Sequence, residues 1–281
     1  MTITDTSPTI EVPRLDAAEV ARLRVTPARV VRSEWRKMVS LRSSWITLGL
    51  AIIFLPGVGA AIAWSTANDW QNMRPRQKMR FDPLSEPLSG FNLAQLAIGV
   101  LGILLIAGEY SGGMIRASLG AVPKRLPVLW AKLGVYCAVT LVTMVPASVV
   151  TFFIAQRLLS SQHIQTTWSA PDVARSVIGV GLYLTVVAAL AIGLGAIIRN
   201  VAGAIAALVG VLIVLPVVAL ALPSTWFDRI YKWLPNNAGQ ALMAFGSDST
   251  TLSPWRGFLT FCAYAAGTLI VAAVLLRRRD A

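Results

Sequence analysis

The residues of this sequence that could carry out chemistry are few and far apart. The single histidine, His163, lies in a polar stretch, and Cys137 and Cys262 lie alone inside separate apolar runs. A zinc site needs several His or Cys ligands at close spacing, and a Ser-His-Asp triad needs a better-placed histidine. No G-x-x-x-x-G-K-[ST] sequence, which would hold nucleotide phosphates, occurs. The sequence therefore predicts no catalytic residue, no metal site and no cofactor bound directly by this chain.

One ionisable residue, Glu109, has an unusual position. It follows a long apolar run and opens the sequence GEYSGGMIRASL at residues 108–119. A carboxylate at the end of an apolar helix is costly unless a cation or backbone N–H groups compensate it, and Arg116 is a candidate partner. Gly112 and Gly113 allow the chain to turn sharply. The pattern predicts a short lateral helix after this turn.

The elements that must position this segment are membrane spans. The chain is 56% apolar and 14% charged, whereas a soluble domain is ~45–50% apolar and ~25% charged. Runs free of Asp, Glu, Lys and Arg occur at 45–66, 90–108, 133–156, 176–198, 200–222 and 257–276. Each can cross a ~30 Å hydrocarbon core as a helix, the form in which lipid tolerates the backbone. We therefore predict an all-α integral membrane protein with six transmembrane helices in residues 45–279.

Small residues suggest how two of these spans pack. Ala191 and Gly195, and likewise Gly203 and Ala207, repeat at a spacing of four. Such pairs allow helix backbones to approach closely. We expect spans four and five to be in close contact.

The charged residues predict an orientation. The net charge is +12, but Lys and Arg gather at the ends of apolar runs instead of forming one patch, which argues against nucleic acid as a partner. Residues 14–42 hold eight basic residues, and Arg277–Arg279 follow the last span. By the positive-inside rule we expect both termini to be cytoplasmic. We expect residues 1–27 to form a disordered cytoplasmic tail.

A second element is predicted before the first span, at residues 28–44. One half of its helical wheel holds the apolar side chains of Val30, Val31, Trp35, Met38, Val39 and Leu41. The opposite half holds Arg29, Arg32, Arg36 and Lys37. A basic amphipathic helix of this kind lies in the lipid headgroup layer. Packing against a soluble partner is the alternative.

These two segments together resemble a known family. The pattern E-Y-x-x-G-x-h-R-x-x-L at 109–119, with Pro123, Arg125 and Lys132 after it, resembles the membrane subunits of type-2 ATP-binding-cassette (ABC) transporters. The segment around Ser33–Arg42 likewise resembles the family's amphipathic connecting helix. Met114 departs from the pattern, because the family often has threonine there. The resemblance covers about residues 28–279.

The resemblance implies a function and a set of partners. The chain would be the permease subunit of an ATP-driven exporter, with separate ATPase subunits that bind ATP and with a second permease, identical or paralogous. The segment after the second span would be the coupling helix that contacts the ATPase. The residues implied in coupling are Glu109, Tyr110, Gly112, Gly113, Arg116 and Leu119. Those implied in the connecting helix are Glu34, Trp35, Lys37 and Arg42.

The loop at 223–256 is predicted to lie on the outer face. Its aromatic residues are interleaved with charges, as is typical of a membrane interface. By resemblance to exporter subunits, Trp233–Leu242, with Pro235 at its bend, would form a short helical lid over the pathway. An interfacial belt without a gating role is the alternative.

The spans also bear on the energy source and the substrate. Because they lack Asp, Glu and His, a carrier driven by protons or ions is not predicted. Small and apolar residues favour an amphipathic or hydrophobic substrate, such as a drug, a peptide or a lipid-like molecule. Two alternatives stay open: a sensor or immunity subunit that docks an ATPase without exporting, and a membrane enzyme with an unrecognised site.

Overall fold

The computed structural model describes residues 26–111, 126–244 and 251–278. These residues form helices and no strands. The helices at the first half of the chain are α2 (Pro27–Ser40), α3 (Arg42–Asp69), α4 (Pro75–Arg80), α5 (Ser85–Leu88), α6 (Phe91–Ser111), α8 (Leu126–Leu159) and η1 (Ser160–Gln162). Those of the second half are α9 (Val173–Ile198), α10 (Val201–Val209), η2 (Gly210–Val214), α11 (Leu215–Ala219), α12 (Ser224–Ile230), η3 (Tyr231–Trp233), α13 (Pro235–Gln240) and α14 (Pro254–Arg278).

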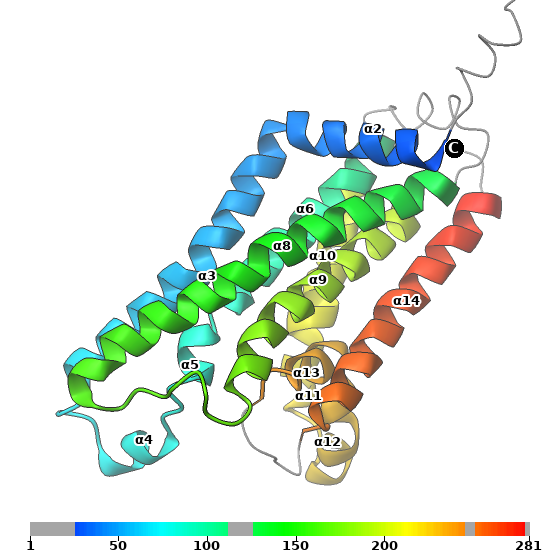
Figure 1. Cartoon of the computed structure of the whole chain (residues 1–281). Coiled ribbons are helices and arrows are strands. Elements are labelled where there is room, and N and C mark those ends of the chain that lie inside the picture. The colour runs from blue at the N-terminus through cyan, green and yellow to red at the C-terminus, as the bar shows by residue number, and fades with distance from the viewer. Residues whose placement is uncertain (1–25, 112–125, 245–250, 279–281) are drawn as a thin grey trace, which may run out of the picture.

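Six helical segments in the described part of the chain are long and apolar enough to cross a membrane. They are Arg42–Asp69, Ser85–Tyr110, Leu126–Gln162, Val173–Ile198, Val201–Ala219 and Pro254–Arg278. The prediction of a multi-pass, all-helical membrane protein is confirmed at this level. The helices form one bundle, with α2 across one end and α4, α12 and α13 at the other (Figure 1). We call these the α2 end and the α12 end.

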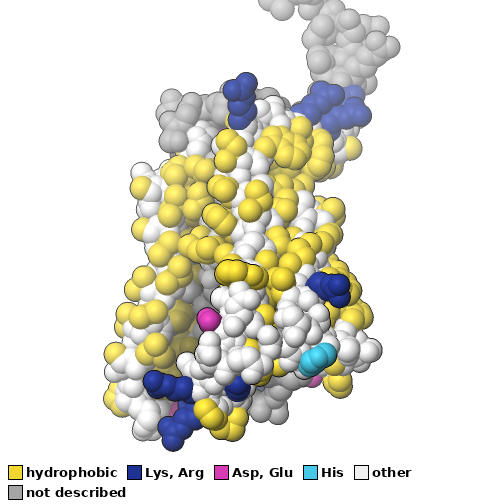
Figure 2. Space-filling model, turned by 90° about the vertical axis from the view of Figure 1, so that its left-hand side faces the viewer, with side chains coloured by type: hydrophobic (Ala, Val, Ile, Leu, Met, Phe, Trp, Pro, Cys, Tyr) yellow, Lys and Arg dark blue, Asp and Glu magenta, His cyan; other side chains and the backbone are white. Residues whose placement is uncertain are grey.

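The bundle has a centre and a periphery. In the most apolar stretches of α6 and α9, 72% and 67% of residues are buried, against 22–33% in the other four spans. The largest buried side chains include Tyr136, Tyr183 and Phe261, and they belong to one continuous apolar core. On the face seen in Figure 2, apolar side chains cover the middle of the molecule, while Lys and Arg lie mainly toward its two ends. This distribution suits a bundle surrounded by lipid.

Ala191 and Gly195 of α9 pack on α6, whereas the prediction paired them with the fifth span. A Cβ atom added at Gly195 would lie 2.6 Å from Ile106 Cγ2 in α6, and one added at Gly102 in α6 would lie 2.9 Å from Ala191 Cβ. The surface of α9 that carries Ala191 and Gly195 therefore packs on α6. The spacing alone indicated a close approach but not its partner.

The fifth span is irregular. Its α-helical part α10 passes into the π-helical segment η2 and then into α11, where Pro216 is the second residue. Proline has no N–H to donate to the carbonyl four residues earlier, and its ring crowds that carbonyl. The widened π turn directly before Pro216 accommodates both effects.

The amphipathic segment ends earlier than predicted. Helix α2 stops at Ser40, Leu41 is extended with φ −83° and ψ 115°, and α3 begins at Arg42. The corner is held by Trp45 Nε1, which donates to the Val39 carbonyl at 2.7 Å. Arg42 is therefore the first residue of the first span and does not belong to the helix predicted at 28–44. Because the corner separates α2 from α3, α2 can lie across the bundle end (Figure 1).

Candidate functional site

Four charged side chains meet at the α2 end and form what we call the charge cluster: Glu34, Lys37, Glu109 and Lys132. Lys132 Nζ lies 2.6 Å from Glu34 Oε2 and 3.0 Å from Glu109 Oε1. Lys37 Nζ lies 2.9 Å from Glu34 Oε1 and 3.3 Å from Glu109 Oε1. Three elements are thereby linked: α2, the last part of α6 and the first part of α8.

The fold of α2 explains why this cluster is buried. Val30, Glu34 and Met38 recur every four residues and form the buried stripe of the helix. Val30 packs with two residues of α8. Val128 lies one turn before Lys132, and Ala131 directly precedes it. This contact brings Glu34 to Lys132 although 98 residues separate them in sequence.

The charge cluster holds two carboxylates and two ammonium groups, but one carboxylate oxygen lacks a hydrogen-bond partner among the described residues. Glu34, Glu109 and Lys132 have side chains at most 8% exposed, and Lys37 is 34% exposed. Burial lowers the pKa of Lys37, but the two carboxylates outweigh burial, so its pKa lies above the ordinary value of 10.5. Glu109 Oε2 is buried and has no hydrogen-bond partner in the described part of the chain. Such an oxygen is costly to bury and is a site where a donor would bind.

A pocket of about 450 Å³ opens beside the charge cluster. Its lining comprises the four charged residues, Met38, Ser40, Leu41 and Ser43 of the α2–α3 corner, Leu104, Leu105 and Gly108 of α6, and Val135 and Tyr136 of α8. The pocket therefore places four charged side chains within a largely apolar lining from α2, α3, α6 and α8. A ligand with a charged headgroup could be held there.

The cluster also brackets the predicted coupling segment. Glu109 lies two residues before the end of α6, and Lys132 lies in the second turn of α8. Gly112, Gly113, Arg116 and Leu119 lie outside the described residues, as does the short helix predicted there. Among the described residues, the cations beside Glu109 are Lys132 and Lys37; Arg116, a predicted candidate partner, lies outside the described part of the chain.

Sequence reasoning did not select Lys132 as a site residue. It was seen as the charge that delimits the third span, which was predicted to begin at 133. The structure continues the helix back to Leu126 and buries Lys132. The signal that could have identified Lys132 was its position one turn inside an apolar helix. Glu109 needs a nearby cation, and a buried lysine could supply it.

Tyr110 has a separate partner. Its ring lies 4.8 Å from the guanidinium carbon of Arg199, a cation–π geometry. Arg199 has φ 57°, a left-handed conformation, and it turns the chain between α9 and α10. The side chain of Asn200 then accepts from the Gly203 N–H at 2.8 Å and caps α10. Tyr110 thereby ties the end of α6 to this turn.

The remaining predicted residues lie apart from the cluster. Trp35 is on α2 but points away from the buried stripe and is 49% exposed. At the α12 end, Trp233 stacks 5.4 Å from the Arg256 guanidinium, and its carbonyl accepts from Tyr264. Pro235 is buried at the first position of α13. Short helices do follow one another between the last two spans, as predicted.

A second polar group, the amide cluster, lies buried toward the α12 end and was not predicted. The Tyr183 hydroxyl of α9 lies 2.7 Å from Asn236 Oδ1 of α13 and within hydrogen-bonding distance of Gln95 Oε1 of α6. It can donate to one of these at a time. We define the amide cluster as Gln95, Tyr183 and Asn236. Gln95, a polar residue inside an apolar run, was the sequence signal for it.

Comparison with known proteins gives no assignment: no protein-family model matches the chain, and no curated protein matches it. Among the described residues, no group of three or more His, Cys, Asp or Glu side chains could hold a metal ion. The geometry itself is the basis for a functional proposal.

Proposed function

We propose that this chain is the membrane-spanning permease subunit of an ATP-driven ABC-type exporter in a bacterial cell membrane, with ATP hydrolysed on separate subunits. The observation that carries the proposal is the charge cluster at the two ends of segment 112–125. Glu109 precedes this segment, Lys132 follows it, and Glu34 and Lys37 join both to α2. A displacement of the segment would therefore be transmitted to three helices together.

Several features support this proposal. In the proposed orientation the α2 end is cytoplasmic and faces the ATPases. The apolar stripe of Val31, Trp35 and Val39 is exposed on α2, as expected of a helix lying in the headgroup layer. The periphery of α14 exposes Trp255, Leu259 and Ile270, a surface that suits lipid or a second permease copy.

The mechanism follows from the linkage of the helices. ATP binding closes the ATPase subunits and moves the segment after α6. The charge cluster makes α2, α6 and α8 respond as a unit, because breaking a buried pair costs ~3–5 kcal/mol. The bundle then exchanges between states open to either side, with an amphipathic or hydrophobic substrate in its pathway. The short helices Tyr231–Gln240 form the outer lid in this proposal.

The test is co-purification of the tagged protein in a mild detergent, followed by identification of bound chains and measurement of ATP hydrolysis. The expected result is a retained P-loop protein whose hydrolysis responds to the permease. Glu109→Ala should leave assembly intact and reduce transport at least tenfold, because the coupling segment loses its anchor. Glu86→Ala is the matched control, since it removes an exposed carboxylate at the α12 end.

Three outcomes would contradict all or part of the proposal. Absence of any ATPase in several mild detergents would argue for a membrane protein that works alone. Normal transport by Glu109→Ala would exclude the coupling role of the charge cluster. ATP turnover without movement of any amphiphile would favour a sensor or immunity subunit.

A further inference from the structure

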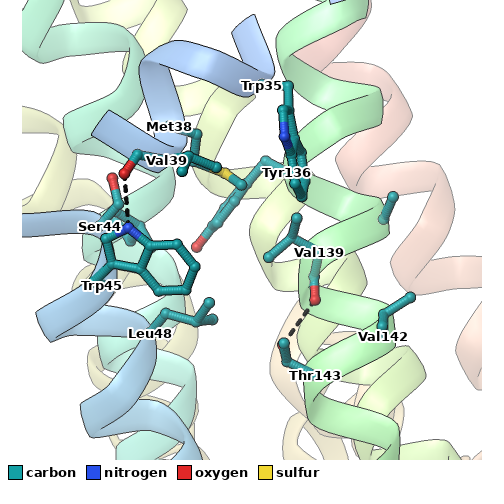
Figure 3. A pocket seen from close by; sticks show the side chains of 12 residues that line it. Trp35, Met38, Val39, Ser44, Trp45, Leu48, Tyr136, Val139, Val142 and Thr143 are labelled. Carbon is teal, nitrogen blue, oxygen red and sulfur yellow. Dashed lines mark hydrogen bonds between the residues drawn. The ribbon is translucent and has the colours of Figure 1, made fainter. Parts of the chain in front are cut away.

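A second pocket adjoins the one beside the charge cluster. It has a volume of about 290 Å³ and lies between the α2–α3 corner and α8. Figure 3 shows Trp45 and Leu48 on one side, Val139 and Val142 on the other, Trp35 above Val139, and Tyr136 between the two sides. Its lining is almost wholly apolar, so a hydrocarbon chain suits it.

The two pockets share part of one wall. Met38 and Tyr136 line both of them. A single molecule at this wall would therefore have apolar surroundings at one end and the charge cluster at the other. That combination fits an amphiphile from the surrounding leaflet.

One buried polar atom defines what such a molecule must offer. Glu109 lines the charged pocket, and its Oε2 has no hydrogen-bond donor among the described residues. An ammonium group that carries an N–H supplies such a donor to the carboxylate.

Exposed cations on α2 attract the phosphate of a lipid at this level of the membrane. Arg32 and Arg36 are exposed on α2, and Lys37 is on the wall of the charged pocket. Cations at this level of a membrane attract lipid phosphates. An ammonium headgroup, a phosphate, an ester and an acyl chain occur in that order in one class of membrane lipid.

We propose that α2, α3, α6 and α8 form a binding site for a phospholipid whose ammonium headgroup carries at least one N–H. The ammonium donates to Glu109 Oε2, and an acyl chain occupies the pocket between Trp45 and Val142. The site does not require the ATPase partner proposed above, and its test uses the permease alone.

The test compares headgroups that differ only in their number of N–H donors. Delipidated protein in detergent is titrated with phosphatidylethanolamine, its N-methyl and N,N-dimethyl derivatives, and phosphatidylcholine of the same acyl chains, and bound lipid is counted by native mass spectrometry. Charge and phosphate are constant through this series. Since one N–H suffices for Oε2, the expected result is a drop of about tenfold at the last methyl group, the loss of one charge-assisted hydrogen bond. Equal affinity across the series would overturn the proposal.

A pair of variants tests the location independently of the charge cluster. Ala138→Trp places a large side chain from an exposed position into the apolar pocket and should reduce phosphatidylethanolamine retention about tenfold. Ala263→Trp, exposed on α14 and outside both pockets, should have no effect. Equal retention by the two variants would place the lipid elsewhere. Preference for phosphatidylglycerol would show that anionic attraction to α2, and not Glu109, governs binding.

Discussion

The two ends of the bundle join helices by different chemistry. At the α2 end, the charge cluster links α2, α6 and α8 through two carboxylates and two ammonium groups. At the α12 end, the amide cluster links α6, α9 and α13 through a hydroxyl and two neutral amides. Both lie largely out of solvent. Only the charge cluster depends on matched opposite charges.

The surroundings of the two clusters also differ. Tyr183 is held between aromatic rings, with Phe91 at 5.5 Å and Phe261 at 5.2 Å between ring centroids. The charge cluster instead borders a pocket and retains an unpartnered oxygen in the described structure. The amide cluster is therefore held by packing beside a pocket that none of its three residues lines, whereas the charge cluster itself lines a pocket where a ligand can bind. The α2 end is therefore the better placed of the two to receive a signal from a bound molecule.

The largest change in the free energy of unfolding is expected at Lys132. Lys132→Met leaves Glu34 and Glu109 without their most buried cation, so the free energy of unfolding should fall by ~3–5 kcal/mol. Unfolding with increasing SDS mole fraction in mixed micelles measures this change. The control Arg76→Met removes an exposed cation in α4 and should change it by less than ~0.5 kcal/mol. A Lys132→Met loss no larger than the control would show that the charge cluster does not hold the helices together.

Removing one group of the amide cluster should lower the free energy of unfolding by a smaller amount. Tyr183→Phe keeps the ring stack but removes the hydroxyl that donates to Gln95 Oε1 or Asn236 Oδ1, at a cost of ~1–3 kcal/mol in unfolding free energy. Asn236 Oδ1 still accepts from Gln240 Nε2 at 2.8 Å. The matched control is Tyr264→Phe, because that hydroxyl donates to a carbonyl on an exposed surface, where the net cost is ~0.5 kcal/mol. The same unfolding assay applies. If Tyr183→Phe cost more than Lys132→Met, the contrast between the two ends would be reversed.

The smallest effect is expected for Lys37, the partly exposed member of the charge cluster. Lys37→Met should lower the unfolding free energy by about 1 kcal/mol or less, because water and salt screen this ammonium. The pKa of Lys37 is raised in the folded protein, so its contribution is fully present below the unfolded value of 10.5 and is lost as pH rises through the folded-state pKa.

Unfolding of the wild type and Lys37→Met at several pH values measures this dependence. The difference between the two should be constant from about pH 6 to 9, well below the point where a lysine titrates. It should shrink above pH 10.5. A difference that changed near pH 7 would point to another titrating group.

Much of the fold could be predicted because lipid imposes long apolar runs. Each of the six predicted spans coincides with an observed helix, and the main errors lie where a charge was used as a boundary. Because Lys132 was used as its boundary, the third span was predicted to begin at 133, yet α8 begins at Leu126. A lysine can lie inside a helix when a distant carboxylate neutralises it. A single sequence does not show that distant pairing.

The site could be predicted only in part. Glu109, Glu34 and Lys37 were selected from two separate segments, but nothing in the sequence indicated that they meet. The amide cluster was missed because Gln95 and Tyr183 carry no charge and Asn236 lies in a loop-like stretch. Neutral hydrogen-bonded groups leave only a faint signal in an apolar sequence. Arg42 was assigned to the wrong helix because the corner at Leu41 involves no proline or glycine.

The pairing of Glu34 with Lys132 also bears on how the protein is made. A chain grows from its N-terminus, so α2, α3 and α6 leave the ribosome before α8. Among the described residues, the cation that Glu34 and Glu109 can share until then is Lys37. Since their buried partner Lys132 is 98 residues beyond Glu34, the charge cluster is complete only after the third span has been inserted. The charge cluster therefore also sets an order of assembly, because the contacts of α2 are complete only when α8, the third span, is in place.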